Sequence, residues 1–133
     1  MSWPAGHWDI WAPGFTWMLL KRRRPRLWVE LHRSIWWHQK KTWRQGYTQW
    51  LMRQKARPVL MQHRYAAVPR SVMYPKGAIT AAFPGAPFHG TVDWLMALAI
   101  WLQVKEIAVW GVDYASSHEE VYQKVGAAYW VGV

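Results

Sequence analysis

The order of apolar and polar residues predicts four short strands in the first 74 residues. His7–Ala12 alternates polar with apolar side chains and ends at a Pro-Gly pair, and Leu27–His32 is a second strand candidate. Two short apolar runs, Pro58–Gln62 and Ser71–Tyr74, predict the third and fourth strands. Each run spans only four to six residues, so the pattern indicates a sheet of short strands.

Helical spacing of apolar residues predicts three helices around and after these strands. The first runs from Ser34 to Arg53, and the last begins at about His118. Between them, Thr91 is expected to cap a helix over Val92–Val104, which is apolar nearly all round and should be buried against a sheet. Residues 75–87 contain three prolines and two glycines, and no element is predicted there.

Lys105–Val112 follows the apolar helix and has the pattern of a buried strand, which we expect at the centre of the sheet. Strands that alternate with helices indicate a small three-layer α/β fold, Rossmann-like, with a mainly parallel sheet and right-handed crossovers. A chain of 133 residues is most simply one domain. It divides into a basic, Trp-rich half (1–76) and an apolar, acidic half (77–133).

Candidate chemistry gathers where the predicted strands end, because ligands of open parallel sheets bind beyond the carboxyl ends of the strands. Asp113 follows a glycine turn at one such end, where its carboxylate either contacts a ligand or caps the turn. Glu30 and His32 share one strand face, so they either form a catalytic cluster with His32 as general base or a pair that fixes the sheet edge. Thr91 either contacts a phosphate or simply caps its helix.

Charge divides the chain unevenly. Residues 1–76 hold fifteen Lys and Arg against Asp9 and Glu30, whereas residues 77–133 hold two against five acids, for a formal net charge of +10. This balance favours binding of nucleic acid or an acidic protein, although a solvated charge run that keeps the chain soluble is the alternative. The residues expected to bind a polyanion are Lys21, Arg22, Arg23, Arg24 and Arg26.

Thirteen tryptophans and no cysteine complete the composition. Tryptophan is rarely buried completely, so some of these side chains are expected at a groove or at an interface between copies of the chain. Without cysteine there is no disulfide framework and no thiolate metal site, which fits a reducing interior such as the cytoplasm. No histidine pair has metal-ligand spacing, and no apolar run reaches the length of a membrane span, so neither metal, cofactor nor membrane is expected.

A resemblance extends over most of the chain. Thr91 to Tyr114, which ends in Gly-Val-Asp-Tyr, resembles the helix and strand of Rossmann-like bacterial sialyltransferases and MptE-like proteins. Small phage and prophage proteins of that superfamily are more similar still, and they share counterparts of Asp9–Ala12, Val29–His32, Val59–Met61 and Glu120–Gly132. The resemblance is specific for the last 45 residues and moderate for the rest.

The resemblance implies binding of a nucleotide or nucleotide-sugar around Glu30, His32, Thr91, Asp113 and Tyr114, with His32 as the base of a transferase. The chain departs from the family pattern in several places, one of which is Lys124-Val125 where the family has Arg-Pro. The Gly-x-Gly-Pro-Ser loop that supplies amides for phosphate is absent from the printed sequence, and Pro13 replaces an expected asparagine. Either the chain is a fragment of a larger protein, or it is a natural short form that has lost half of its nucleotide site. The competing hypothesis is a non-catalytic protein that binds a nucleic acid or an acidic protein through its basic, Trp-rich half.

Overall fold

The computed structural model describes residues 8–14, 16, 20, 25–34, 45–112 and 118–133. The chain forms two compact units, residues 1–74 and residues 75–133. The first unit carries fourteen Lys and Arg against two acidic residues, and the second carries three against five. The boundary between the units therefore lies within two residues of position 76, which separates the basic half of the sequence from the acidic half.

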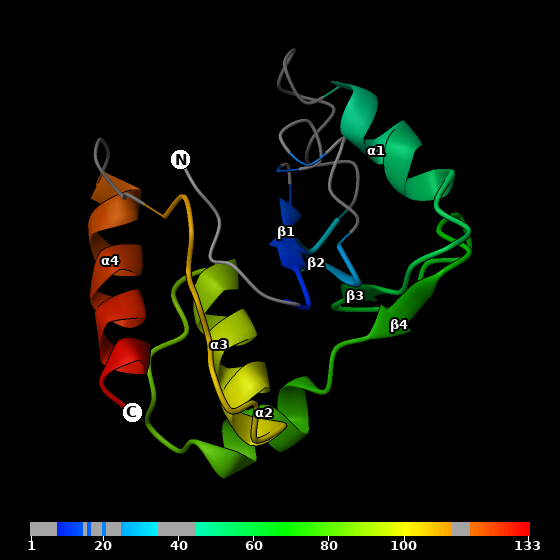
Figure 1. Ribbon diagram of the computed structural model, residues 1–133. Helices are drawn as coiled ribbons and strands as arrows, with labels where there is room; N and C mark the ends of the chain where they lie inside the picture. Colours follow the sequence, from blue (N-terminus) through cyan, green and yellow to red (C-terminus); the bar gives the residue numbers. More distant parts are fainter. Residues whose placement is uncertain (1–7, 15, 17–19, 21–24, 35–44, 113–117) are drawn as a thin grey trace. The chain divides into compact units, whose positions relative to one another are not determined.

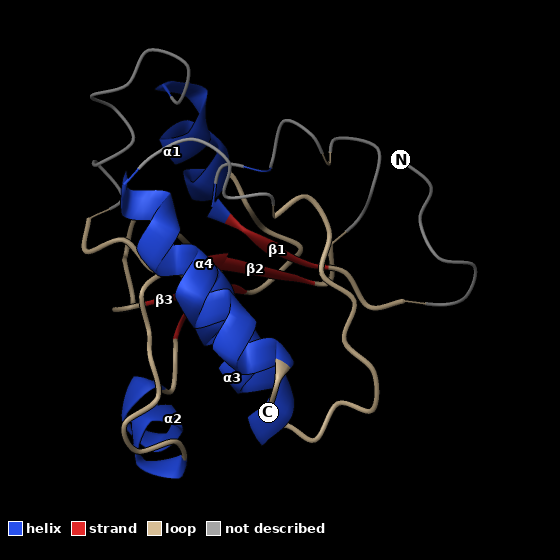
Figure 2. Ribbon diagram, turned by 90° about the vertical axis from the view of Figure 1, so that its left-hand side faces the viewer, coloured by secondary structure: helices blue, strands red, loops and turns tan. Residues whose placement is uncertain are grey.

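Unit 1 is built on a four-stranded parallel sheet in the order β1-β2-β3-β4 (Figures 1 and 2). The strands are β1 (Trp11–Pro13), β2 (Leu27–Glu30), β3 (Val59–Met61) and β4 (Ser71–Met73). Each strand pairs in register with the next along the chain. All four strands overlap the predicted runs, although β1 includes Pro13, which was expected to end the strand, and leaves out residues 8–10. The predicted α/β class with a mainly parallel sheet is confirmed.

The core of unit 1 joins this sheet to helix α1 (Gln45–Met52). Trp28 on β2 is fully buried, and its indole N–H donates a 2.8 Å hydrogen bond to the hydroxyl of Tyr47 on α1. The Trp50 ring lies 4.6 Å from the Trp28 ring, and Leu51 is also fully buried. A Trp that is buried with its one donor satisfied stabilises the contact between helix and sheet. The predicted helix over 34–53 is confirmed over α1, while residues 35–44 lie outside the described part of the chain.

Unit 2 contains helices α2 (Lys76–Ala82), α3 (Thr91–Trp101) and α4 (His118–Val131), and α3 packs on both of the others (Figure 1). Trp130 of α4 is fully buried beside the rings of Phe83 and Phe88, and its Nε1–H donates to a backbone carbonyl at 2.9 Å. The short helix α2 was not predicted, because prolines and glycines around it suggest a loop. None of the described helices is long and apolar enough to cross a lipid bilayer.

The prediction of a central strand over Lys105–Val112 is wrong. Helix α3 ends at Trp101, and Gln103 takes a left-handed φ of 56°, which redirects the chain out of the helix. Residues 104–111 form no strand pairing, and they are exposed, as shown by Val109 at 43%. A strand needs a hydrogen-bonded neighbour, and every strand of the described sheet belongs to unit 1. An apolar run alone does not supply that neighbour.

The described tryptophans divide between core and surface. Trp28 and Trp130 are 1% exposed, whereas Trp8, Trp101 and Trp110 are between 36% and 43% exposed. Tryptophan thus fills the core of each unit, and it also leaves large apolar area open to solvent in both. The expectation that some tryptophans lie at a groove or at an interface between copies stays a prediction.

Candidate functional site at the carboxyl edge of the sheet

Glu30 and His32 form a pair at the carboxyl end of β2. Glu30 is the last residue of the strand and is only 1% exposed, whereas the His32 side chain is 37% exposed. One oxygen of Glu30, Oε1, accepts a hydrogen bond from the His32 backbone N–H at 3.0 Å and also contacts His32 Nδ1. A buried carboxylate requires such donors. The pair anticipated from the two-residue spacing is therefore present.

This pairing determines which imidazole nitrogen can act on a ligand. With Glu30 as a carboxylate, Nδ1 of His32 carries the proton that it shares with Oε1, which leaves Nε2 as the basic nitrogen. A carboxylate that holds one imidazole nitrogen orients the ring and stabilises it when it becomes protonated. The geometry suits a general base on a partly exposed histidine, and it also ties the end of β2 to the following loop.

The loop after β3 is fastened to the chain that follows β2. The Gln62 side-chain amide donates to the backbone carbonyl of Leu31, and the Tyr65 hydroxyl donates to the backbone carbonyl of Arg33 at 2.6 Å. These two bonds join segments more than 30 residues apart at the same edge of the sheet. Three exposed basic side chains lie in the joined segments, namely Arg33, His63 and Arg64.

Gly14, at the end of β1, lies close to the Glu30–His32 pair. It follows β1 with a left-handed φ of +42°, and it is buried. A Cβ placed on Gly14 would lie 3.8 Å from Oε2 of Glu30, so the backbone of this turn runs close to the buried carboxylate. Only glycine takes this conformation without strain, which explains the residue at this position. The ends of three neighbouring strands thus contribute to one polar edge.

The other residues predicted for the site are not seen beside Glu30 and His32 in the described part of the structure. Asp113, Tyr114 and the cations from Lys21 to Arg24 lie outside the described residues. Arg26 is described at the opposite, amino-terminal end of β2, where it forms an exposed 2.8 Å ion pair with Asp9. Sequence reasoning missed Arg33, His63 and Arg64, because their common location depends on the two long-range hydrogen bonds.

Thr91 belongs to unit 2, and its predicted capping role is wrong. The N-cap of α3 is Gly90, and Thr91 is the first helical residue. The helix start is instead satisfied by Asp93, whose Oδ2 accepts backbone N–H bonds from His89 at 2.6 Å and from Gly90 at 3.1 Å. Burial raises the pKa of the Asp93 carboxyl above its ordinary value, and these bonds partly offset the rise.

The chemistry available at the carboxyl edge is that of a carboxylate–imidazole pair with nearby guanidinium groups. Within the described ranges, no three His, Cys, Asp or Glu side chains come together in a way that could hold a metal ion. The arrangement offers a base and anion-binding groups. Comparisons with protein-family models, with curated proteins and with solved structures find no match to this chain.

Proposed function

We propose that the carboxyl edge of the unit 1 sheet binds a nucleotide or a nucleotide-sugar. The observation that carries this proposal is the pair of a buried Glu30 and a partly exposed His32 at the end of a parallel strand, with Arg33 beside it and Arg64 fastened to the same edge. Open parallel sheets bind ligands beyond the carboxyl ends of their strands. The resemblance of the sequence to Rossmann-like sialyltransferases supports the same class of ligand.

Arginines would supply the phosphate contacts in this proposal. The printed sequence has no Gly-x-Gly-Pro-Ser loop to donate backbone amides. Arg33 and Arg64 are exposed, and the Tyr65 hydrogen bond to the Arg33 carbonyl fastens their two segments together. A guanidinium group donates two parallel hydrogen bonds to a phosphate, so a pair of arginines is a suitable replacement for a loop of amides.

A transferase reaction would use His32 as the base. Nε2 would take the proton from an acceptor hydroxyl as the acceptor oxygen attacks the anomeric carbon of the sugar, and the nucleotide would leave with the electrons of the broken glycosidic bond. Glu30 would stabilise the imidazolium that forms. The alternative is a binder without catalysis, in which the pair serves only to fix the sheet edge.

Thermal unfolding in the presence of a panel of uridine and cytidine nucleotides and their sugars tests the binding proposal. A ligand at about one hundred times its Kd stabilises the folded state by roughly 2.7 kcal/mol, which is a readily measured shift of the melting temperature. We expect Arg33→Gln/Arg64→Gln to lose the shift. Lys105→Gln/Lys124→Gln removes the same charge from exposed positions of unit 2 and should keep it. The proposal fails if no nucleotide at millimolar concentration moves the transition.

The His32→Gln variant separates binding from catalysis. If the pair is a catalytic base, this variant should keep the nucleotide-dependent thermal shift but release nucleotide from a nucleotide-sugar about 10²-fold to 10⁴-fold more slowly than the wild type. Equal rates for the two proteins would show that His32 is not a catalytic base, and rates equal to that of the nucleotide-sugar without protein would show binding without catalysis.

A further inference from the structure

The opposite edge of the same sheet carries an arginine before each of three neighbouring strands. Arg26 immediately precedes β2, Arg70 immediately precedes β4, and Arg57 lies two residues before β3. Their order along the edge follows from the parallel pairing, because the N–H of Val59 donates to the Arg70 carbonyl at 2.9 Å and that of Trp28 to the Pro58 carbonyl at 3.1 Å. Neighbouring strands are about 4.8 Å apart, so the row extends over roughly 10 Å of backbone.

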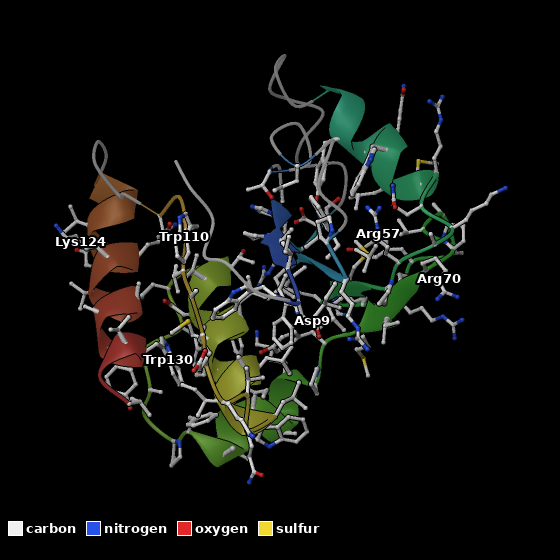
Figure 3. The ribbon with its side chains drawn as sticks, viewed as in Figure 1. Asp9, Arg57, Arg70, Trp110, Lys124 and Trp130 are labelled. Carbon is white, nitrogen blue, oxygen red and sulfur yellow. The ribbon has the colours of Figure 1, made fainter. Side chains whose placement is uncertain are left out.

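Two more cations lie close to these three arginines in the sequence. Arg53 and Lys55 lie in the exposed chain between α1 and β3, immediately before Arg57, and Figure 3 shows Arg57 and Arg70 near the beginning of β3 and β4. The one acidic side chain described at this edge is Asp9, which pairs with Arg26. The described side chains of this edge thus comprise five cations and one carboxylate, which leaves an excess of positive charge.

We propose that the amino-edge row, defined as Arg26, Arg53, Lys55, Arg57 and Arg70, binds the phosphate backbone of a single-stranded nucleic acid. Four of the five cations are arginines, which bind phosphate with two parallel hydrogen bonds. Trp8 is 36% exposed and lies two residues before Ile10, whose carbonyl accepts the Arg26 N–H at 2.8 Å. An accessible indole beside a basic row provides a stacking surface for an unpaired base. A single strand offers unpaired bases, whereas an acidic peptide and a duplex do not.

This site does not depend on the nucleotide proposal. It uses the amino-terminal ends of the strands, whereas Glu30, His32 and Arg33 lie at their carboxyl ends. The ligand is also different, since a row of cations follows a polymer backbone, whereas the Glu30–His32 pair and its arginines suit one small molecule. Either site can be removed by substitution without touching the other.

Fluorescence anisotropy with a labelled 20-nucleotide oligothymidylate, titrated at several salt concentrations, tests the proposal. For single strands the slope of log Kobs against log salt is about −0.7 for each phosphate contact. Arg57→Gln/Arg70→Gln should weaken binding and make this slope less steep by about 1.4. Lys105→Gln/Lys124→Gln, with the same loss of charge, should leave affinity and slope unchanged. Arg57→Lys/Arg70→Lys keeps both charges and should retain the slope.

Two further arms fix the identity of the ligand. Trp8→Ala should weaken binding by roughly tenfold without changing the salt slope, because stacking involves no counterion release. A 20-residue polyglutamate should compete poorly with the oligonucleotide. The proposal is overturned if the oligonucleotide does not bind, or if Arg57→Gln/Arg70→Gln and Lys105→Gln/Lys124→Gln lose affinity equally. It is also overturned if polyglutamate competes as well as the oligonucleotide. A duplex that binds as tightly as the single strand, together with no effect of Trp8→Ala, would overturn it as well.

Discussion

Gly126 on α4 gives the sharpest test of the packing in unit 2, because it lies directly against the buried carboxylate of Asp93. A Cβ at position 126 would lie 2.4 Å from Oδ2 of Asp93 and 2.8 Å from its Cγ. Real Cβ atoms essentially never approach that closely. Asp93 is fully buried and held by backbone N–H groups of His89 and Gly90, so it cannot simply turn away.

We therefore expect Gly126→Ala to destabilise the protein. Overpacking a well-filled core costs about 1–3 kcal/mol, and a weakened hydrogen bond to a charged group costs about 1.5–3 kcal/mol. Replacing a helical glycine with alanine returns at most about 1 kcal/mol. The net expectation is a loss of about 1.5–5 kcal/mol, which lowers the urea midpoint by roughly 0.8–2.5 M when the slope m is near 2 kcal/mol/M.

Gly77 on α2 is the matched control. A Cβ at this position would meet no atom within 4 Å, so Gly77→Ala should stabilise the protein by about 0.5–1 kcal/mol. In an Asp93→Ala background, Gly126→Ala should change sign and become stabilising, because the clash is gone. Urea unfolding, monitored by tryptophan fluorescence, measures the free energy of unfolding of each variant. If Gly126→Ala is as stable as the wild type, the contact between α3 and α4 is not as described.

The same structure gives three further expectations. Because the pKa of Asp93 is raised in the folded state, the stability that its protonated carboxyl contributes is present below the unfolded value of about 3.9 and lost as pH rises through the folded value. Relative to the wild type, Asp93→Asn should therefore become more stable as the pH rises through the folded-state pKa of Asp93. Urea unfolding at a series of pH values measures this difference in the free energy of unfolding. Tyr47→Phe leaves the buried Trp28 N–H without its 2.8 Å acceptor and should cost about 1–3 kcal/mol in the same assay. Tyr65→Phe removes the 2.6 Å bond to the Arg33 carbonyl, which should cost about 0.5–1.5 kcal/mol and weaken nucleotide binding in calorimetric titration.

The strands of unit 1 could be predicted because their signal is local. The short apolar runs that become β2 and β3 are buried on the sheet and bounded by charged or turn-forming residues. Helix α2 was missed because Pro75 lies at its N-cap and Pro84 just beyond its end, so both prolines flank the helix rather than interrupt it. Residues 104–112 have the local composition of a strand, but strand formation depends on a neighbour that the local pattern does not encode.

The candidate site divides in the same way. Glu30 and His32 could be paired from the sequence, since a separation of two residues puts side chains on one face of a strand. Arg33 and Arg64 could not, because their segments meet through Tyr65, 32 residues from Arg33 along the chain. The resemblance to Rossmann-like sialyltransferases stays a prediction, and so does the role of Asp113, which lies outside the described residues.

Nuclear magnetic resonance of the backbone amides during a nucleotide titration tests the central claim most directly, because it reports where a ligand binds. We expect the earliest and largest shift changes at residues 31–33 and 62–65, the two segments that meet at the carboxyl edge, together with Gly14. Arg33→Gln/Arg64→Gln should remove these changes and leave the spectrum otherwise folded. Changes confined to the amino-edge row or to unit 2 would contradict a nucleotide site built around Glu30 and His32.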